Sequence, residues 1–207
     1  MVQVQTCVVG PFQVNMFVLV DEPGRRFAII DAPGMPDLIP QLLDAGYEPA
    51  WLALTHGHID HIAGLKQLKE HLQCPVYLHE ADEYLLDHVT NSPYREILQA
   101  ENPPKPDHKL SPTTTLNLGE STYHVIETPG HTPGGVCLYD GSGTVFSGDT
   151  LFYGSIGRTD LPGGDHSTLI SSIRNQLLTL PDTVTVCPGH GPDTTIGHER
   201  AGNPFLQ

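Results

Sequence analysis

The chain has 207 residues, 38% of them hydrophobic, which is enough to bury a sizeable core, and we expect a single domain over residues 1–207. Its formal net charge is −14, with 10 Lys and Arg against 24 Asp and Glu, which argues against nucleic acid or an anionic membrane as a main partner. No apolar run reaches the length of a membrane span, and the first residues lack a leader-like pattern, so we expect a cytoplasmic protein.

In the first half of the chain, predicted strands alternate with predicted helices. Two apolar strands that flank a Gly-Pro turn, at residues 2–9 and 14–20, predict a hairpin. Further strands are predicted at 27–30, 51–54 and 75–78, and helices at 36–45, 62–72 and 80–89. Residues 90–112 are polar and Pro-rich, and we interpret them as a surface excursion, with a linker between domains as the alternative.

The second half of the chain is richer in strands. We expect strands at 113–118, 121–127, 135–139, 144–146 and 184–187, with helices at 167–178 and around 198–201. Many strands early and late, with helices between them, predict a layered α/β or α+β sandwich.

The most informative stretch is Thr-His-Gly-His-Ile-Asp-His at residues 55–61, directly after the predicted strand 51–54. Neutral imidazole and carboxylate groups are good ligands for zinc and similar divalent ions. His56 and His58 are two residues apart, so both can face one side of an extended loop. Asp60 and His61 are adjacent, so their side chains diverge and can serve a second ion. The alternative is a polar loop with solvated histidines.

Three later segments share one arrangement, in which a strand leads into a Gly-containing turn and then a possible ligand. These ligands are His131, Asp149 and His190, which follow the predicted strands 121–127, 144–146 and 184–187. Glycine before the ligand lets the backbone turn sharply and approach an ion closely. Four strand ends that each deliver ligand types predict a metal site at one edge of the sandwich.

Other residues of these types fit a site less well. Asp31 ends a strand at a Gly-containing loop and is a candidate hydrogen-bond partner for a ligand histidine. The remaining histidines lack the strand-and-turn context, and we expect none of them to be ligands: His71, His79, His88, His108, His124, His166 and His198. The four cysteines form no C-x-x-C pair, and we expect buried free thiols.

The seven candidate ligands together resemble the metallo-β-lactamase superfamily, whose fold is an αββα sandwich (class α+β) with a binuclear metal site at the sheet edge. Residues 148–152 (Gly-Asp-Thr-Leu-Phe), 157–160 (Gly-Arg-Thr-Asp) and 188–197 are similar to segments of glyoxalase II, the hydroxyacylglutathione hydrolases, in their compact single-domain branch. The resemblance implies that His56, His58 and His131 bind one ion, that Asp60, His61 and His190 bind a second, and that Asp149 bridges them. It also implies that Arg158 contacts the glutathione part of the substrate.

Two departures from glyoxalase II concern the substrate. Asp160 stands where the longer enzymes carry a substrate-contacting tyrosine. Only 17 residues of the sequence follow His190, so we expect the helical domain that supplies further basic contacts to glutathione in those enzymes to be missing. The resemblance therefore supports metal chemistry more strongly than glutathione specificity. Asp149 stands where many β-lactamases carry a cysteine ligand, which disfavours that activity.

The expected chemistry is hydrolysis. Two divalent ions about 3.5–4 Å apart can share a bridging hydroxide that attacks a carbonyl carbon, with Asp60 orienting the nucleophile. A thiol with a pKa of about 8.5 leaves as thiolate without a general acid, which favours a thioester over an amide. We expect a metal-dependent thioester hydrolase that acts on a small anionic acyl-thiol, an acyl-glutathione such as S-lactoylglutathione, and that uses zinc, with iron or manganese as alternatives.

Alternative functions remain at this point. The related persulfide (sulfur) dioxygenases use one iron, held by the equivalents of His56, His131 and Asp149, and a lactonase or phosphodiesterase is a third possibility on this fold. A non-catalytic metal-binding module is the alternative from another class.

Overall fold

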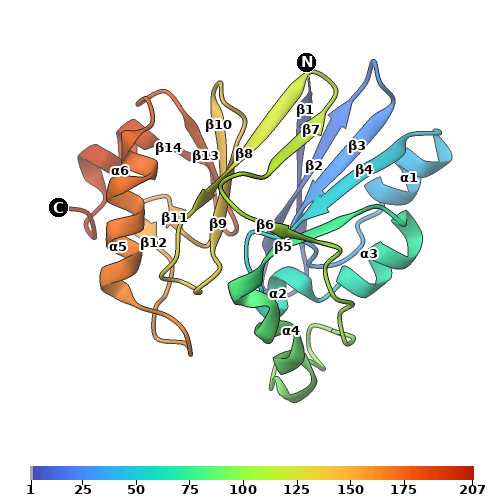
Figure 1. Cartoon of the computed structure of the whole chain (residues 1–207), viewed down its shortest axis with the longest axis horizontal. Helices are drawn as coiled ribbons and strands as arrows, with labels where there is room; N and C mark the ends of the chain where they lie inside the picture. Colours follow the sequence, from blue (N-terminus) through green and yellow to red (C-terminus); the bar gives the residue numbers. More distant parts are fainter. Residues whose placement is uncertain (1) are drawn as a thin grey trace.

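The computed structural model describes residues 2–207, and it contains two six-stranded sheets that pack face to face with helices outside both (Figure 1). In order across the first sheet, the strands are β1 (Gln3–Val9), β2 (Val14–Asp21), β3 (Arg26–Ile30), β4 (Glu48–Ala53), β5 (Val76–His79) and β6 (His108–Leu110). The second sheet runs β14 (Thr194–Thr195), β13 (Thr185–Pro188), β10 (Thr144–Gly148), β9 (Val136–Tyr139), β8 (Ser121–Glu127) and β7 (Thr115–Leu118).

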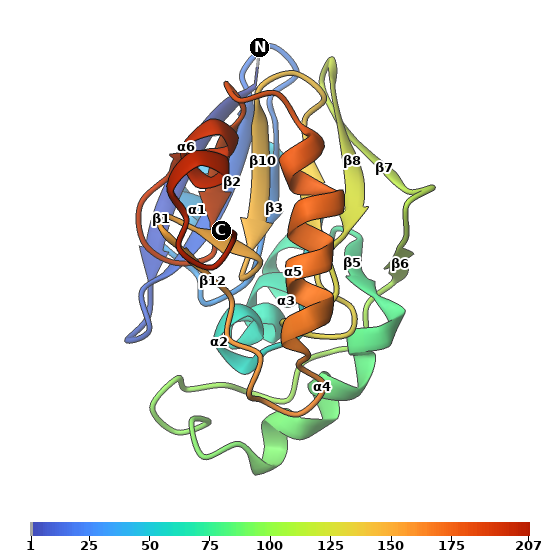
Figure 2. The same ribbon diagram turned by 90° about the vertical axis from the view of Figure 1, so that its left-hand side faces the viewer.

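The helices form the two outer layers. The first sheet is covered by α1 (Leu38–Asp44), α2 (Ile59–Ile62), α3 (Leu65–Leu72) and α4 (Glu83–His88), whereas α5 (His166–Asn175) and α6 (Ile196–Gly202) lie over the second sheet (Figure 2). Short 3₁₀ turns occur at Glu80–Asp82, Val89–Asn91 and Leu177–Thr179. The predicted αββα sandwich is therefore confirmed.

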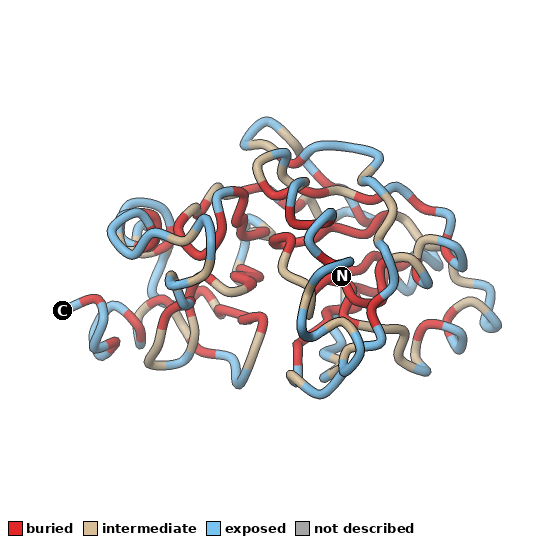
Figure 3. The backbone as a smooth tube through the Cα atoms, turned by 90° about the horizontal axis from the view of Figure 1, so that it is seen from below, coloured by how far each residue is buried: buried red, intermediate tan, exposed pale blue. Residues whose placement is uncertain are grey.

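A four-layer sandwich has three apolar cores between its layers, and strand β2 contributes side chains to two of them. All eight of its residues are buried. Met16 and Val18 face the helices, whereas Phe17 and Leu19 alternate with them and face the second sheet. A third core lies between the second sheet and α5, with Leu169 and Ile173 from the helix. The buried segments accordingly follow the strands through the middle of the molecule (Figure 3).

The strand directions bring the important loops to one edge. β3, β4, β5 and β6 are parallel, so the loops after β3 and β4 leave the first sheet at the same edge. In the second sheet β10 and β13 are parallel, and β8 and β10 both run antiparallel to β9, so β8, β10 and β13 also end together. The carboxyl ends of these strands meet where the sandwich opens.

The predicted helix 62–72 is wrong in its start and in its continuity, because α2 begins at Ile59 and Gly64 separates it from α3. Gly64 packs against the loop after β3: its N–H donates to Ala32 O, and a Cβ atom there would lie 2.7 Å from Gly34 N. Asp60 and His61 consequently lie on a helical turn rather than in an extended loop.

The other differences concern short elements. The predicted helix 80–89 begins with a 3₁₀ turn, and the excursion 90–112 contains strand β6. The two-residue strands β11 (Leu151–Phe152), β12 (Ser155–Ile156) and β14 had no sequence pattern long enough to predict them. Among residues 2–207, no helix is long and apolar enough to cross a membrane. Three of the four free cysteines are buried, as expected, and Cys7 is half-buried.

Candidate metal centre

The segments that follow β4, β8, β10 and β13 bring all seven predicted ligands together at the open edge of the sandwich, five of them from loops and Asp60 and His61 from α2. Their side-chain nitrogen and oxygen atoms form three groups, in each of which the atoms lie within 4.8 Å of one another. The groups are His56, His58 and His131; Asp60, His61 and His190; and His56, His61 and Asp149. The first two groups match the two ligand sets that the family resemblance implied, and the third contains the implied bridging residue.

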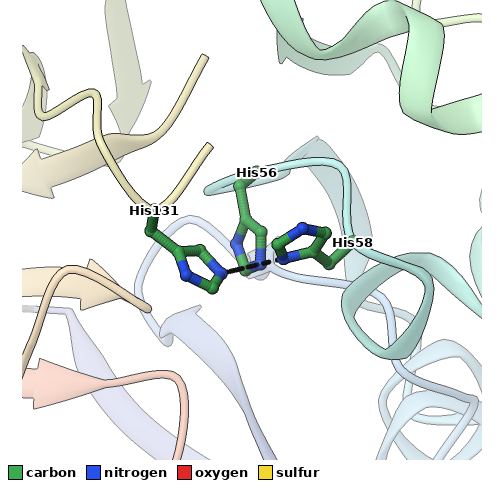
Figure 4. Close-up of side chains that lie close together, drawn as sticks. All are labelled: His56, His58 and His131. Atoms are coloured by element: carbon green, nitrogen blue, oxygen red, sulfur yellow. Dashed lines mark hydrogen bonds between the residues drawn. The ribbon is translucent and has the colours of Figure 1, made fainter. Parts of the chain in front are cut away.

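The first group joins the two sheets. His56 and His58 follow β4, and His131 follows β8 on the facing sheet (Figure 4). His131 Nε2 lies 2.8 Å from His58 Nδ1 and 3.3 Å from His56 Nε2. Three ring nitrogens that converge in this way leave room for one small cation between them.

The second group also joins the two sheets, because Asp60 and His61 follow β4 whereas His190 follows β13. His61 Nε2 lies 3.3 Å from His190 Nε2, and His190 Nε2 lies 3.4 Å from Asp60 Oδ2. Asp149 lies between the groups, with Oδ1 3.3 Å from His61 Nε2 and Oδ2 3.6 Å from His131 Nε2. Its carboxylate is therefore within reach of both.

The opposite nitrogens of three rings are held by oxygen atoms. His131 Nδ1 lies 2.7 Å from the Arg158 carbonyl oxygen, and His190 Nδ1 lies 3.0 Å from that of Phe12. A carbonyl only accepts, so each Nδ1 carries the hydrogen and the Nε2 of the neutral ring presents its lone pair to the cluster. Ring nitrogens of the cluster lie 2.8–3.3 Å apart, and lone pairs that face one another over these distances repel unless a proton or a metal ion lies between them.

Asp31 holds the third of these rings. Its carboxylate is fully buried, and Oδ2 lies 2.9 Å from His61 Nδ1 while Oδ1 accepts the Thr55 N–H at 2.8 Å. Asp31 has φ +65°, a left-handed conformation that Asp tolerates better than most residues. The sequence had suggested Asp31 as a partner of a ligand histidine, and the structure places it there.

Burial and charge set the protonation of the cluster. Burial lowers the pKa of His58 to about 4, and burial together with the neighbouring rings holds the pKa of His56 well below its usual value. Burial raises the pKa of Asp149, but the adjacent histidines outweigh it and bring this pKa below the usual range. Two neutral imidazoles and a carboxylate at pH 7 are the forms that bind a divalent ion.

The pKa of His61 shifts in the opposite direction to those of His56 and His58. Burial lowers the pKa of its ring, but the surrounding carboxylates, of which Asp149 acts most strongly, outweigh burial and raise the pKa well above its usual value. A positive charge is thus favoured at the centre of this group. A proton can supply it, and a divalent ion that displaces the proton supplies more.

Two observations fit a metal ion at Asp149. Among residues 2–207, Asp149 Oδ1 is the one buried side-chain oxygen or nitrogen without a hydrogen-bond partner, and such atoms are costly unless something satisfies them. Gly189 leaves space beside it, since a Cβ atom at residue 189 would lie against Asp149 Oδ1 and 2.7 Å from His61 Cε1. The donor set of His and Asp suits zinc, iron or manganese.

The cluster forms one wall of a pocket of about 660 Å³. Five of the seven candidate ligands line it: His58, Asp60, His131, Asp149 and His190. The remaining lining is mostly apolar and comes from Phe12, Ile59, Tyr94, Phe152, Ile156 and Leu161. This volume suits a small organic substrate beside the ligands.

Arg158 also lines the pocket, as its proposed substrate contact requires, but its guanidinium is engaged. Arg158 Nε donates to Asp160 Oδ1 at 2.8 Å, and a terminal nitrogen donates to Oδ2 at 2.7 Å. The pair is largely exposed. Arg158 therefore presents a cation that is already partly neutralised.

The sequence predicted only the ligands and Arg158 among the residues that line the pocket, and two of the aromatic residues it missed come from irregular segments. Phe12 lies in the β1–β2 turn and Tyr94 in the Pro-rich excursion, and their rings meet edge to face with centroids 5.3 Å apart. A Pro-rich excursion beyond a helix carries no pattern that indicates which of its residues returns to a site. The only general signal is an aromatic residue within a polar segment.

Comparison with known proteins agrees with the fold. The Metallo-beta-lactamase superfamily model matches residues 9–190, a range that contains every candidate ligand. The chain is 39% identical to the probable metallo-hydrolase YqgX of Bacillus subtilis over 201 residues, which cover 96% of this chain and 94% of that protein. It is 38% identical to the hydroxyacylglutathione hydrolase GloC of Haemophilus influenzae over 202 residues, covering 96% and 95%.

Solved structures give the same picture. The B3 metallo-beta-lactamase BLEG-1 superposes with a TM-score of 0.88 at 40% identity, over 99% of this chain and 100% of that one. TTHA1623 in a di-iron-bound form gives 0.85 at 38% identity, over 98% and 100%, and ETHE1 from Myxococcus xanthus gives 0.78 at 25%, over 98% and 83%. The chain therefore belongs to the metallo-beta-lactamase superfamily.

Proposed function

We propose that this protein is a metal-dependent hydrolase that cleaves the thioester of a small acyl-thiol, with an acyl-glutathione such as S-lactoylglutathione as the first candidate. The observation that carries the proposal is the meeting of two three-residue ligand sets at Asp149, on the wall of one pocket. The similarity to a hydroxyacylglutathione hydrolase supports the choice of substrate class.

We assign His56, His58 and His131 to one ion and Asp60, His61 and His190 to the other, with Asp149 shared. Zinc is our first choice, and iron or manganese are the alternatives. When bound, two divalent ions supply Lewis acidity and a water of lowered pKa. Asp60 faces the pocket next to His190, so its carboxylate can accept a hydrogen bond from an attacking water and orient it.

The pocket lining suits the two ends of an acyl-thiol. Apolar side chains such as Ile59, Phe152 and Ile156 can contact a short acyl group, while Arg158 offers a guanidinium to an anionic thiol carrier. The leaving group of a thioester is a thiolate, whose conjugate acid has a pKa of about 8.5 in a simple cysteine. Such a group leaves without a general acid, so the reaction does not require an acid in the pocket.

The decisive experiment measures thiol release from S-lactoylglutathione by the purified protein, with bound metal quantified in the same sample. We expect release in proportion to metal content, and reconstitution of apo-protein with zinc, iron or manganese identifies the active ion. A fully metallated protein that releases no thiol from this or an uncharged thioester would refute the proposal.

Two competing activities are tested on the same sample. A mononuclear-iron persulfide dioxygenase, suggested by the ETHE1 structure, would consume oxygen with glutathione persulfide and would need only one iron. The β-lactamase activity named for BLEG-1 would open a chromogenic β-lactam. The convergence of Asp60, His61 and His190 as a second ligand set favours a two-metal hydrolase over the dioxygenase.

A further inference from the structure

A buried carboxylate outside the ligand set ties together the two loops that carry the first group of histidines. Asp82 ends the 3₁₀ turn after β5 and has 0% of its surface exposed. Its Oδ2 accepts the Gly57 N–H at 2.9 Å and the Thr132 hydroxyl at 2.7 Å, and its Oδ1 accepts the Gly134 N–H at 2.6 Å.

These donors adjoin the predicted ligands in sequence. Gly57 lies between His56 and His58 in the loop after β4, and Thr132 follows His131 in the loop after β8. The first loop belongs to one sheet and the second to the other. One side chain thus spans the junction between the halves of the sandwich at the point where the three rings converge.

The chemistry of the contact explains why the residue is a carboxylate. Two of the three donors are backbone N–H groups, which can only donate, and Asp82 has no ion-pair partner within 4 Å among the described residues. A buried unpaired carboxylate is costly, and these charge-assisted hydrogen bonds offset that cost. An asparagine at residue 82 would turn its amide NH₂ toward Gly57 or Gly134 and leave one backbone N–H without an acceptor.

We propose that Asp82 is a positioning residue for the metal ion bound by His56, His58 and His131. Its hydrogen bonds fix the distance between His131 and the loop that carries His56 and His58. It acts through the backbone and a hydroxyl group and contacts no substrate. This inference rests on the metal-binding part of the proposed function and is independent of the thioester substrate. Asp31 serves the other ligand group differently, because it contacts the ring of His61 directly.

The test measures metal affinity rather than turnover. In a His190→Ala background, which disables the second ligand set, zinc affinity of the apo-protein is determined by competition with a chelating indicator. We expect Asp82→Asn to weaken zinc binding about 10- to 100-fold, the range usual for groups that orient metal ligands. Thr132→Val removes one of the three hydrogen bonds at similar volume and should have a smaller effect in the same direction.

Glu199→Gln is the matched control. Glu199 is equally buried, and its carboxylate likewise accepts three hydrogen bonds, from Gly154 N, Thr194 Oγ1 and Asn203 Nδ2, but it lies in α6 away from the ligand loops. Both variants should lower the melting temperature of the apo-protein, and only Asp82→Asn should weaken zinc binding.

The outcomes are distinct. If Asp82→Asn and Thr132→Val lower the melting temperature and keep the zinc affinity of their background, Asp82 is merely structural and the inference is wrong. If Asp82→Asn fails to fold, Thr132→Val decides the question alone. A parent protein that binds neither zinc nor iron nor manganese overturns both this inference and the proposed function, whereas tight metal binding without thiol release overturns only the latter.

Discussion

Arg158, which lines the pocket, forms a two-point ion pair with Asp160, so the guanidinium that would meet an anionic substrate already has a carboxylate partner. The guanidinium beside Asp160 lowers the pKa of that carboxyl to about 2, so the pair remains charged over the whole working range of pH. If Arg158 contacts an anionic thiol carrier, as we propose, the affinity for that carrier should depend on both residues.

Asp160→Asn should improve binding of an anionic acyl-thiol. Removing the carboxylate frees Arg158, and we expect KM for S-lactoylglutathione to fall roughly 2- to 5-fold at low salt, the scale of one exposed ion pair. Steady-state kinetics at low and high ionic strength test this, because salt should erase the difference.

Arg158→Ala is the companion variant. It should raise KM for S-lactoylglutathione and leave kcat nearly unchanged, since the Arg158 carbonyl that holds His131 remains in place. An uncharged thioester should respond to neither change. An unaltered KM for the glutathione thioester in both variants would remove Arg158 from the substrate site.

Gly189→Ala should disable the metal centre with little effect on the fold. The added methyl group would press on Asp149 Oδ1 and on the ring of His61, and we expect metal affinity to fall at least about 10-fold. Metal content after dialysis and the melting temperature of the apo-protein give the two readouts. Gly202→Ala, at the exposed end of α6 with nothing within 4 Å, is the control and should keep its metal.

Loss of a predicted ligand should remove metal and activity together. For His58→Ala and Asp149→Ala we expect at least about a 100-fold lower rate, and Asp149→Ala should lose both ions because its carboxylate lies within reach of both groups. His71→Ala, an exposed histidine whose Nδ1 donates to Gln67 O, is the control. Full activity in a metal-poor Asp149→Ala protein would contradict the assignment of this residue.

The free energy of unfolding of the apo-protein should depend on pH below about 4, in part because of Asp165 at the start of α5. Its Oδ1 accepts hydrogen bonds from the Ser167 hydroxyl and the Thr168 N–H, which lower its pKa to about 2. Because this pKa is lowered in the folded state, the contribution of Asp165 to the free energy of unfolding is complete above the unfolded-state pKa of about 3.9. The contribution is lost as the pH falls through about 2, and roughly half of it is gone near pH 3.

Urea midpoints of the parent protein and Asp165→Ala, both as apo-protein, measure this contribution. The difference between them should be largest at pH 6 and should shrink at pH 3. A constant difference over this range would mean that the charge of Asp165 does not matter for the N-terminus of α5.

The features that could be predicted from the sequence are those with a local pattern. The order of strands and helices predicted a layered sandwich, whose four αββα layers the family resemblance then implied. A strand followed by a turn and a ligand type located His131, Asp149 and His190, which the structure brings beside the 55–61 segment. Their roles as ligands, and that of Arg158 toward substrate, stay predictions.

The features that could not be predicted depend on distant contacts. The break at Gly64 arises from packing against Gly34, thirty residues earlier, and Asp82 stands inside an expected helix with no local sign of its three donors. Tyr94 reaches the pocket from a segment without periodicity. In each case the partner is supplied by tertiary packing, which overrides local preference.

Each ligand set joins parts of the chain that are far apart: 73 residues separate His58 from His131, and 129 separate His61 from His190. A bound ion would therefore act as a reversible cross-link across a long loop, in a chain whose four cysteines are all free. Because only the folded chain assembles these sites, metal supply would lengthen the lifetime of the protein as well as activate it. In a metal-starved cell, proteases would encounter the opened chain more often, and the protein's abundance would follow the metal concentration.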